Sequence, residues 1–222
     1  LTATAALLSA MPPAAKADTP APVFLGPTPY LSFADSPYLG GNFDWFHLED
    51  FEDHLFNVPG VMASAGGVTS VVFGPSIHDS VDADDGVIDG SGLDGDSYYT
   101  ASGHIGITFR FNAGVLGTLP THVGLVWTDG GHSASVTFSA FGAQGELLFT
   151  ETHSGFADNA NDGGTAEDRF FGVVHTAGVS AIFMRNSSGG MEVDHLQYGS
   201  LAPIPEPGTW ALMLAGVAAL GS

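Results

Sequence analysis

The chain has 222 residues, with 24 acidic against four basic side chains and a formal net charge of −20. Such an acidic surface repels nucleic acid phosphates and anionic lipid headgroups, so we exclude binding to either and expect affinity for cations, above all calcium. The sequence contains no cysteine, which excludes disulfides, thiolate metal sites and cysteine nucleophiles. With 31 glycines, 13 prolines and 16 phenylalanines, the composition favours short aromatic strands between many turns.

Residues 1–17 resemble a secretory signal peptide, with residues 2–11 as its apolar, alanine-rich centre. Ala15 and Ala17 supply the small side chains that signal peptidase requires, which predicts cleavage before Asp18. The basic residues that open such peptides are not in the printed chain, so we expect the segment to begin upstream. Residues 18–42 follow with repeated prolines, which predict an extended leader rather than a helix.

Residues 43–202 predict a single all-β domain. The clearest alternation covers residues 104–112, where Ile105, Ile107, Phe109 and Phe111 fall on one face. Further short apolar runs recur about every ten residues, with turn-forming residues between them and no helical period. These runs cover residues 45–53, 68–73, 123–127, 135–141, 146–153, 169–174, 179–185 and 191–198. The pattern predicts an antiparallel β-sandwich of the jelly-roll-like type.

Residues 203–222 join the triplet Pro205, Glu206 and Pro207 to an unbroken apolar run over residues 209–221. The run has about half of the roughly 20 residues that a membrane-spanning helix needs, so we expect an apolar helix that continues beyond Ser222. The layout resembles the sorting tail of PEP-CTERM proteins, which exopolysaccharide-producing bacteria export across the inner membrane. The resemblance implies processing by signal peptidase and a dedicated sorting enzyme, with contact to the membrane only through the tail.

Parts of the domain also resemble the mature domain of a family of PEP-CTERM proteins. The similar strings are residues 48–53, 80–90, 165–173 and 193–199. The resemblance implies a fold and an exported location, tethered at the inner membrane in transit and then at the cell surface, without an established activity. We therefore expect a non-catalytic cell-surface or extracellular-matrix protein associated with exopolysaccharide. The alternatives are a calcium-dependent carbohydrate-binding module and a laminarinase-like glycoside hydrolase.

Aspartates crowd between glycines in residues 79–96, and carboxylates so close together repel one another unless a hard cation neutralises them. The spacing does not fit an EF-hand, because Val81 and Ala83 occupy positions that need oxygen ligands. Many sandwich modules hold calcium between acids of the first strand and an aspartate of the last. That comparison predicts calcium between Glu49, Asp50 or Glu52 and Asp194. The acidic loop adds Asp82, Asp84, Asp85 and Asp89 as predicted calcium ligands. A solvated acidic surface that keeps an exported protein soluble is the alternative.

Catalytic motifs are incomplete, so we predict that the chain is not an enzyme. Glu192 and Asp194 share one face of the last predicted strand, as retaining glycosidases require of their carboxylates. The laminarinase motif needs a third acid, however, where Leu196 or Gln197 stands. Residues 131–135 lack the closing glycine of a nucleophile elbow, and the histidines show no paired zinc-binding spacing.

Tyr98 and Tyr99 are the predicted sugar-stacking residues. Adjacent residues of a strand point to opposite faces, so these two rings cannot both face the core. Their position beside the acidic segment favours them over the other large aromatic residues, which a sandwich needs in its core.

Overall fold

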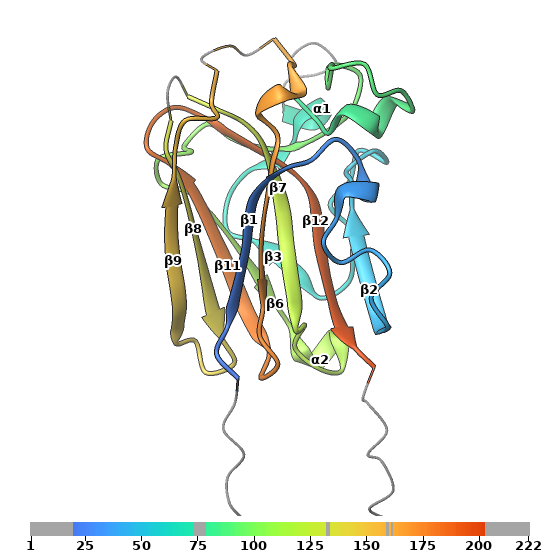
Figure 1. The fold of residues 1–222 in the computed structure, drawn as a ribbon, viewed down its shortest axis with the longest axis vertical. Coiled ribbons are helices and arrows are strands. Elements are labelled where there is room, and N and C mark those ends of the chain that lie inside the picture. The colour runs from blue at the N-terminus through green and yellow to red at the C-terminus, as the bar shows by residue number, and fades with distance from the viewer. Residues whose placement is uncertain (1–19, 73–78, 132–133, 159, 161, 203–222) are drawn as a thin grey trace, which may run out of the picture.

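The computed structural model describes residues 20–72, 79–131, 134–158, 160 and 162–202. Two antiparallel sheets pack face to face, which confirms the predicted β-sandwich (Figure 1). The predicted signal peptide, residues 1–17, and the predicted sorting tail, residues 203–222, lie outside the described residues. Within the described part of the chain, no helix is long and apolar enough to cross a membrane.

The first sheet has seven strands in the order β1-β10-β7-β12-β5-β4, and β2 also pairs with β12. Its strands are β1 (Val23–Pro29), β2 (Phe43–Glu49), β4 (Gly67–Val68), β5 (Tyr98–Thr100), β7 (His122–Gly130), β10 (Arg169–Val174) and β12 (Met191–Leu201). β12 is the centre of the sheet, because it pairs with β7 on one side and with both β2 and β5 on the other. β1 lies in the predicted leader, so this part of the leader is an edge strand paired with β10.

The second sheet has five strands in the order β3-β6-β11-β8-β9. Its strands are β3 (Val61–Ala63), β6 (Ile107–Phe111), β8 (Val136–Gly142), β9 (Leu147–His153) and β11 (Val179–Asn186). The alternation predicted from residue 104 is wrong at its start, since Ile105 is 67% exposed. The N–H groups of Ile105 and Gly106 both bond to the carbonyl of Ser102, and Gly106 has φ +90°, so a turn precedes the strand.

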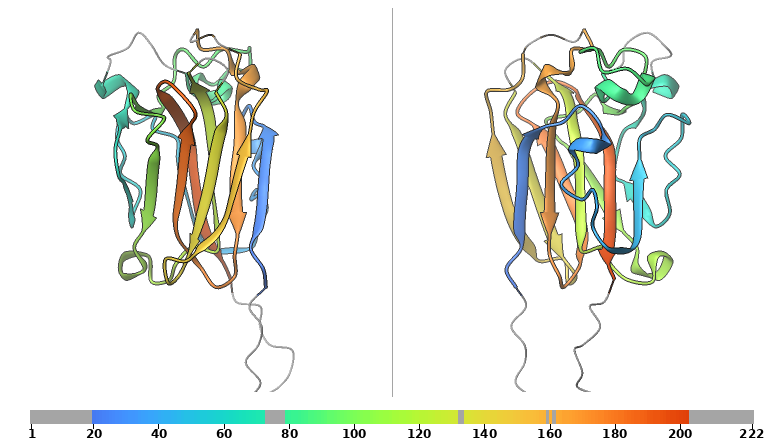
Figure 2. Two further views of the ribbon diagram at one scale, coloured as in Figure 1. Left: turned by 90° about the vertical axis from the view of Figure 1, so that its left-hand side faces the viewer. Right: turned by 45° about the vertical axis from the view of Figure 1, so that its right-hand side comes forward.

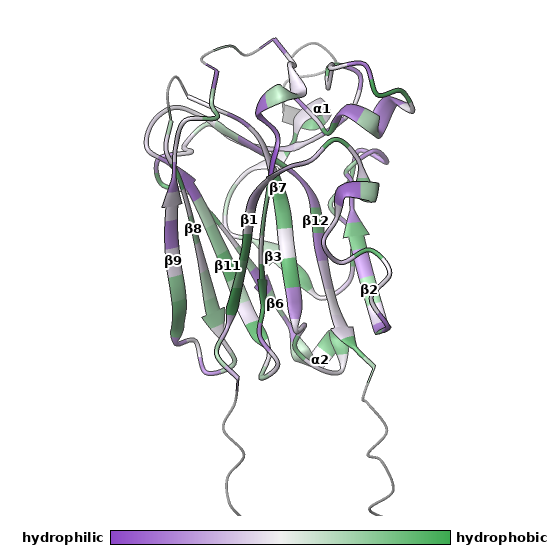
Figure 3. Ribbon diagram, viewed as in Figure 1, coloured by the Kyte–Doolittle hydropathy of each residue, from purple (hydrophilic) through white to green (hydrophobic). Residues whose placement is uncertain are grey.

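The helices among the described residues are single turns of three or four residues. They are α1 (Thr69–Val72), α2 (Ala113–Leu116) and the 3-10 turns η1 (Phe33–Asp35), η2 (Asp82–Asp85) and η3 (Thr165–Glu167). The loops that carry η2 (green) and η3 (orange) lie at the same end of the sandwich in every view (Figures 1 and 2). Figure 3 shows that hydrophilic residues concentrate in these end loops, while apolar residues follow the strands.

Apolar side chains cover both faces of the seven-stranded sheet. The core between the sheets contains Leu125, Trp127 and Phe138, all fully buried. A smaller cluster covers the outer face and consists of Tyr30, Tyr38, Val81, Val126 and Phe170. The polar residues on the outer face of β12 are therefore buried under residues 30–38 and 79–85 instead of facing water.

Candidate metal centre

The outer face of β12 places two carboxylates, Glu192 and Asp194, under the segment of residues 79–85. The backbone N–H of Asp79 donates to Glu192 at 2.9 Å, and the N–H of Val81 donates to Asp194 at 3.0 Å. Val81 itself is fully buried in the outer apolar cluster. These contacts hold the segment against the strand, so the aspartates that it carries lie beside the carboxylates of β12.

A first group of three carboxylates, Asp79, Asp129 and Glu167, forms where three segments meet. Asp79 precedes η2, Asp129 lies near the end of β7, and Glu167 ends η3. One oxygen of each lies within 4.8 Å of the others. Asp79 is 4% exposed and Glu167 is 3% exposed, and within the described residues Oδ1 of Asp79 has no hydrogen-bonding partner. The group offers only oxygen ligands, which are the ligands that hard cations prefer.

The electrostatic surroundings of this group oppose ionisation of its carboxyl groups. Burial raises the pKa of Asp79 to about 10, and repulsion from Glu192 and Asp129 adds to the effect. Burial raises the pKa of Glu167 to about 8 and that of Glu192 to about 8. Near neutral pH these carboxyl groups therefore hold protons, unless a cation takes the place of the protons.

Asp168 is a further buried carboxyl group near Asp79 and Glu167. It is fully buried, and neither of its carboxylate oxygens has a hydrogen-bonding partner within the described ranges. Burial raises its pKa, and repulsion from Asp79 and Glu167 raises it further. A buried carboxyl group without a hydrogen bond is costly, so a positive charge in the neighbouring group would lower the energy of Asp168 as well.

A second group consists of Asp84, Asp194 and His195, and its two β12 residues follow Glu192 along the strand. One ligand atom of each lies within 4.8 Å of the others. Nε2 of His195 is 3.0 Å from Oδ1 of Asp84. Asp194 is fully buried, and its pKa is raised by burial and by repulsion from Asp84.

The predicted calcium ligands divide between these groups and other roles. Asp84 and Asp194 come together, as members of the second group with His195. Glu49 does not join them, because its carboxylate accepts the N–H groups of Phe51, Asn57 and Val58 and so holds the loop after β2. In the same way, Glu52 accepts the N–H of Asp96 at 2.5 Å.

The other predicted ligands organise turns. Asp82 accepts the N–H groups of Asp89 and Gly90 and the hydroxyl of Thr165, which fixes the loop around η2. Asp50 accepts the N–H of Glu52, and the exposed Asp85 accepts the N–H of Val87. Asp89 is exposed on the same loop. None of these residues belongs to either three-residue group among the described residues.

Sequence reasoning did not identify Asp129 and Glu167 as candidate ligands. Asp129 stands in a stretch typical of a turn, and Glu167 stands in a polar loop. The signal that could have found them is their position: β7 ends and β10 begins at the same sheet end, with Trp127 opposite Arg169. Acids just after one antiparallel strand and just before its neighbour meet at that end.

The catalytic candidates are not arranged for turnover. Asp194 is fully buried and Glu192 is 6% exposed, so neither carboxylate is open to a sugar chain. Ser70, His54 and Asp96 do lie together, but Oγ of Ser70 and the carboxylate of Asp96 both contact Nδ1 of the imidazole. A catalytic triad places the hydroxyl and the carboxylate on opposite ring nitrogens. Residues 132–133 of the elbow-like stretch lie outside the described residues.

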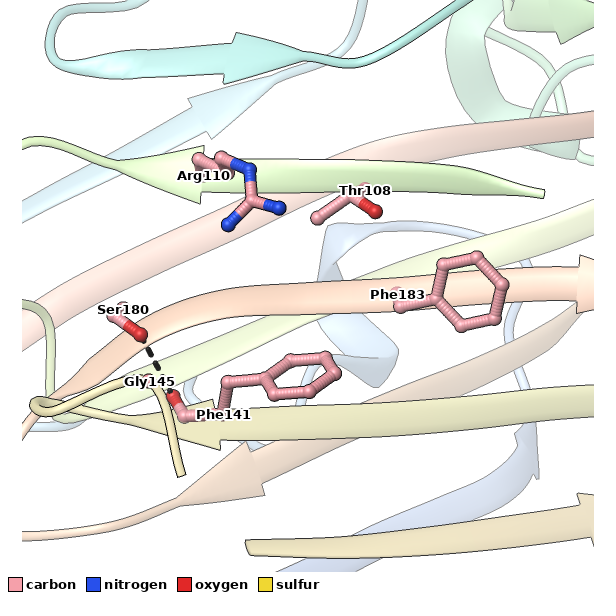
Figure 4. A pocket seen from close by; sticks show the side chains of 6 residues that line it. All are labelled: Thr108, Arg110, Phe141, Gly145, Ser180 and Phe183. Atoms are coloured by element: carbon pink, nitrogen blue, oxygen red, sulfur yellow. Dashed lines mark hydrogen bonds between the residues drawn. The ribbon is translucent and has the colours of Figure 1, made fainter. Parts of the chain in front are cut away.

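A hollow of about 220 Å³ lies on the outer face of the five-stranded sheet. Its lining residues are Thr108, Arg110, Phe141, Gly145, Ser180 and Phe183. Figure 4 shows the guanidinium of Arg110 and the rings of Phe141 and Phe183 around it, from β6, β8 and β11. The predicted sugar-stacking residues lie elsewhere: Tyr98 is buried in the core, and only Tyr99 is partly exposed.

Comparison with known proteins does not identify a family. No protein-family model matches the chain, and no curated protein or solved structure is significantly similar to it. What the protein does is therefore inferred from its own residues.

The buried carboxyl groups predict an unusual dependence of stability on pH when divalent ions are removed. Asp79, Glu167 and Glu192 are protonated in the folded chain but ionised in the unfolded chain between their ordinary pKa and their raised pKa. The folded state then binds more protons. The contribution of these three groups to the free energy of unfolding is therefore fully present below about pH 4 and is lost as the pH rises through about 8. Urea unfolding in chelator should show a loss of at least about 3 kcal/mol between about pH 5 and pH 9.

Glu192→Gln should make this pH dependence shallower, because the amide does not ionise while Asp79 and Glu167 still do. The exposed Glu146 in the turn between β8 and β9 gives the matched control, and Glu146→Gln should keep the full slope. A free energy of unfolding that stays constant or rises over this interval would contradict the proposed protonation of the buried group.

Proposed function

We propose that the chain is an exported, non-catalytic β-sandwich protein of the cell surface or extracellular matrix that binds calcium through Asp79, Asp129 and Glu167. The meeting of these three carboxylates, with Oδ1 of Asp79 buried and without a hydrogen-bonding partner in the described part of the chain, carries the proposal. A single divalent cation would satisfy that oxygen and remove the repulsion between the three groups.

Calcium fits this group better than other common ions. Its ligands are oxygens at 2.3–2.6 Å, so two oxygens on opposite sides of the ion are up to about 5 Å apart. The ligand oxygens of the group lie within 4.8 Å of one another. Magnesium needs shorter, strictly octahedral bonds, and zinc and copper favour nitrogen or sulfur ligands that the group does not contain.

Export is supported by the sequence alone. The signal peptide of residues 1–17 and the sorting motif Pro205, Glu206 and Pro207 are its basis, and both lie outside the described residues. The jelly-roll-like form of the sandwich belongs to the same proposal. Its support is that the chain alternates between the sheets, with β10 and β12 in one and β11 in the other.

Calcium should stabilise the chelator-treated protein. At 100 times the dissociation constant, one bound ion adds about 2.7 kcal/mol to the free energy of unfolding. For a domain of this size that corresponds to a rise in Tm of about 5–10 °C. Glu167→Gln keeps an acceptor for the N–H of Asp158 but removes a ligand charge, so it should lose most of the rise. Differential scanning calorimetry with and without calcium measures both effects.

Asp85→Asn is the matched control, because Asp85 is exposed on η2 and belongs to neither three-residue group. This variant should retain the calcium response of the unaltered protein. An unchanged Tm at millimolar calcium, or an equal rise in Glu167→Gln, would overturn the calcium site.

Fractionation of cells that produce the protein with both ends intact tests the exported location. The protein should reach the cell surface or the medium, with a shorter-lived form in the inner membrane. Replacing Pro205, Glu206 and Pro207 by alanine should leave it in the inner-membrane fraction. Cytoplasmic recovery of the unaltered protein would contradict export.

Carbohydrate binding is a second candidate function, favoured by the hollow on the five-stranded sheet. Phe141 and Phe183 present partly exposed rings there, and the exposed guanidinium of Arg110 offers hydrogen-bond donors beside them. Rings and donors side by side suit a sugar, which has an apolar face and a rim of hydroxyl groups. The hollow is formed by strands of the second sheet, so this function does not require the calcium ligands.

A glycan array tests this candidate with and without chelator. Phe183→Ala should weaken binding to any captured glycan by roughly tenfold, as expected for the loss of one aromatic contact. Val23→Ala, an exposed position on β1 of the seven-stranded sheet, is the control and should bind normally. Binding that is equal in Phe183→Ala would remove the hollow as the sugar site.

A further inference from the structure

The second group, Asp84, Asp194 and His195, is a buried mixed nitrogen and oxygen set. The side chains of His195 and Asp84 are 5% and 7% exposed, and Asp194 is fully buried. Nε2 of His195 and Oδ1 of Asp84 are 3.0 Å apart. The other oxygen of Asp84, Oδ2, is buried and has no hydrogen-bonding partner among the described residues. The group therefore has a free buried ligand atom that the Asp84–His195 contact does not use.

A distortion of the β12 backbone brings the side chains of Asp194 and His195 to the same face of the sheet. In a regular strand two adjacent residues point to opposite faces of the sheet. Here the pairing of β12 with β7 shifts register between Asp194 and Gln197, and His195 has φ +43°. This bulge turns the imidazole to the outer face, beside Asp84, while Leu196 returns to the core. A non-glycine residue in this left-handed region is strained, and such strain is concentrated at functional sites.

A chain of hydrogen bonds fixes the orientation of the imidazole. Nδ1 of His195 is 2.9 Å from the hydroxyl of Tyr30. That hydroxyl accepts Nε2–H of Gln197 at 2.9 Å, and Ser36 donates to Oε1 of Gln197 at 2.5 Å. Histidines that bind metals usually hold their second ring nitrogen in this way. With a metal ion on Nε2, the ring hydrogen would stand on Nδ1, next to the hydroxyl of Tyr30.

We infer that Asp84, Asp194 and His195 form a second metal site, separate from the calcium group, that takes a transition-metal ion of the zinc class. Imidazole together with carboxylates favours such ions over calcium and magnesium. Two ligands bound to zinc at 2.0–2.2 Å with a tetrahedral angle are about 3.3–3.6 Å apart, a few tenths of an ångström more than the separation of Nε2 and Oδ1. Three protein ligands leave a fourth position for water or for a small ligand.

The site differs from the calcium group in its ligands and in its selectivity. The calcium group contains no nitrogen ligand, and the two groups share no residue, although Asp79 and Asp84 both belong to the segment of residues 79–85. The other calcium ligands lie near the end of β7 and on η3, whereas the other ligands of this site lie at the bulge of β12. Failure of one site to bind its ion therefore does not entail failure of the other. Zinc measured in excess calcium reports the second site alone.

Calorimetric titration of chelator-treated full-length protein with zinc, in excess calcium, tests the inference. One zinc ion should bind per chain, and His195→Gln should weaken its affinity by at least about 100-fold. Tyr30→Phe, which removes the hydroxyl that holds Nδ1, should weaken it by about tenfold. Cobalt in place of zinc should give the intense visible absorption of a four- or five-coordinate site with a nitrogen ligand.

Two control variants and a second ligand variant separate the loss of a zinc ligand from a general effect on folding. Glu167→Gln and His54→Gln, which lie outside the site, should bind zinc normally. Asp84→Asn, on the short η2 turn, tests the site if circular dichroism shows that His195→Gln does not fold. Absence of zinc binding, its displacement by calcium, or equal affinity in the folded ligand variants would each overturn the site.

Discussion

Burial of carboxyl groups along the outer face of β12 is the constraint on which the rest of this structure depends. The segment of residues 79–85 lies over Glu192 and Asp194, and its backbone N–H groups bond directly to them. Removing ionised carboxylates from water costs several kcal/mol for each group unless a proton or a cation compensates. Both three-residue groups follow from this one contact, because the segment contributes Asp79 to the first and Asp84 to the second.

The apolar cluster on the outer face explains why the fold tolerates this arrangement. Val81 packs with Tyr30, Tyr38 and Phe170, so the segment cannot leave the strand without exposing buried aromatic surface. The free energy of that packing holds mutually repelling carboxyl groups together. Ion binding would then reduce the repulsion between these carboxyl groups. Metal affinity is therefore coupled to the stability with which residues 79–85 pack on β12.

The sequence predicted the all-β sandwich well, because alternation in runs such as that of Ile107, Phe109 and Phe111 has a direct physical meaning. It predicted the start of that strand wrongly, because Gly106 adopts a left-handed conformation that interrupts the extended backbone. Glycine adopts left-handed and extended conformations about equally well, so the residue type alone does not reveal the turn. Of the calcium ligands that it predicted, Asp84 and Asp194 come together in one three-residue group. Aspartates within one loop, such as Asp82, bond to the loop's own N–H groups, whereas the first group joins residues far apart in sequence. The bulge that turns His195 outward also has no sequence signal.

The central claim is that one calcium ion binds the carboxylates of Asp129 near the end of β7, Glu167 on η3 and Asp79 before η2. A crystal structure of the protein grown in calcium, with the anomalous signal of calcium measured, tests this claim most directly. The account predicts an anomalous peak between Asp79, Asp129 and Glu167, with ligand oxygens at about 2.3–2.6 Å. Well-ordered side chains without such a peak, joined instead by hydrogen bonds between protonated carboxyl groups, would contradict it.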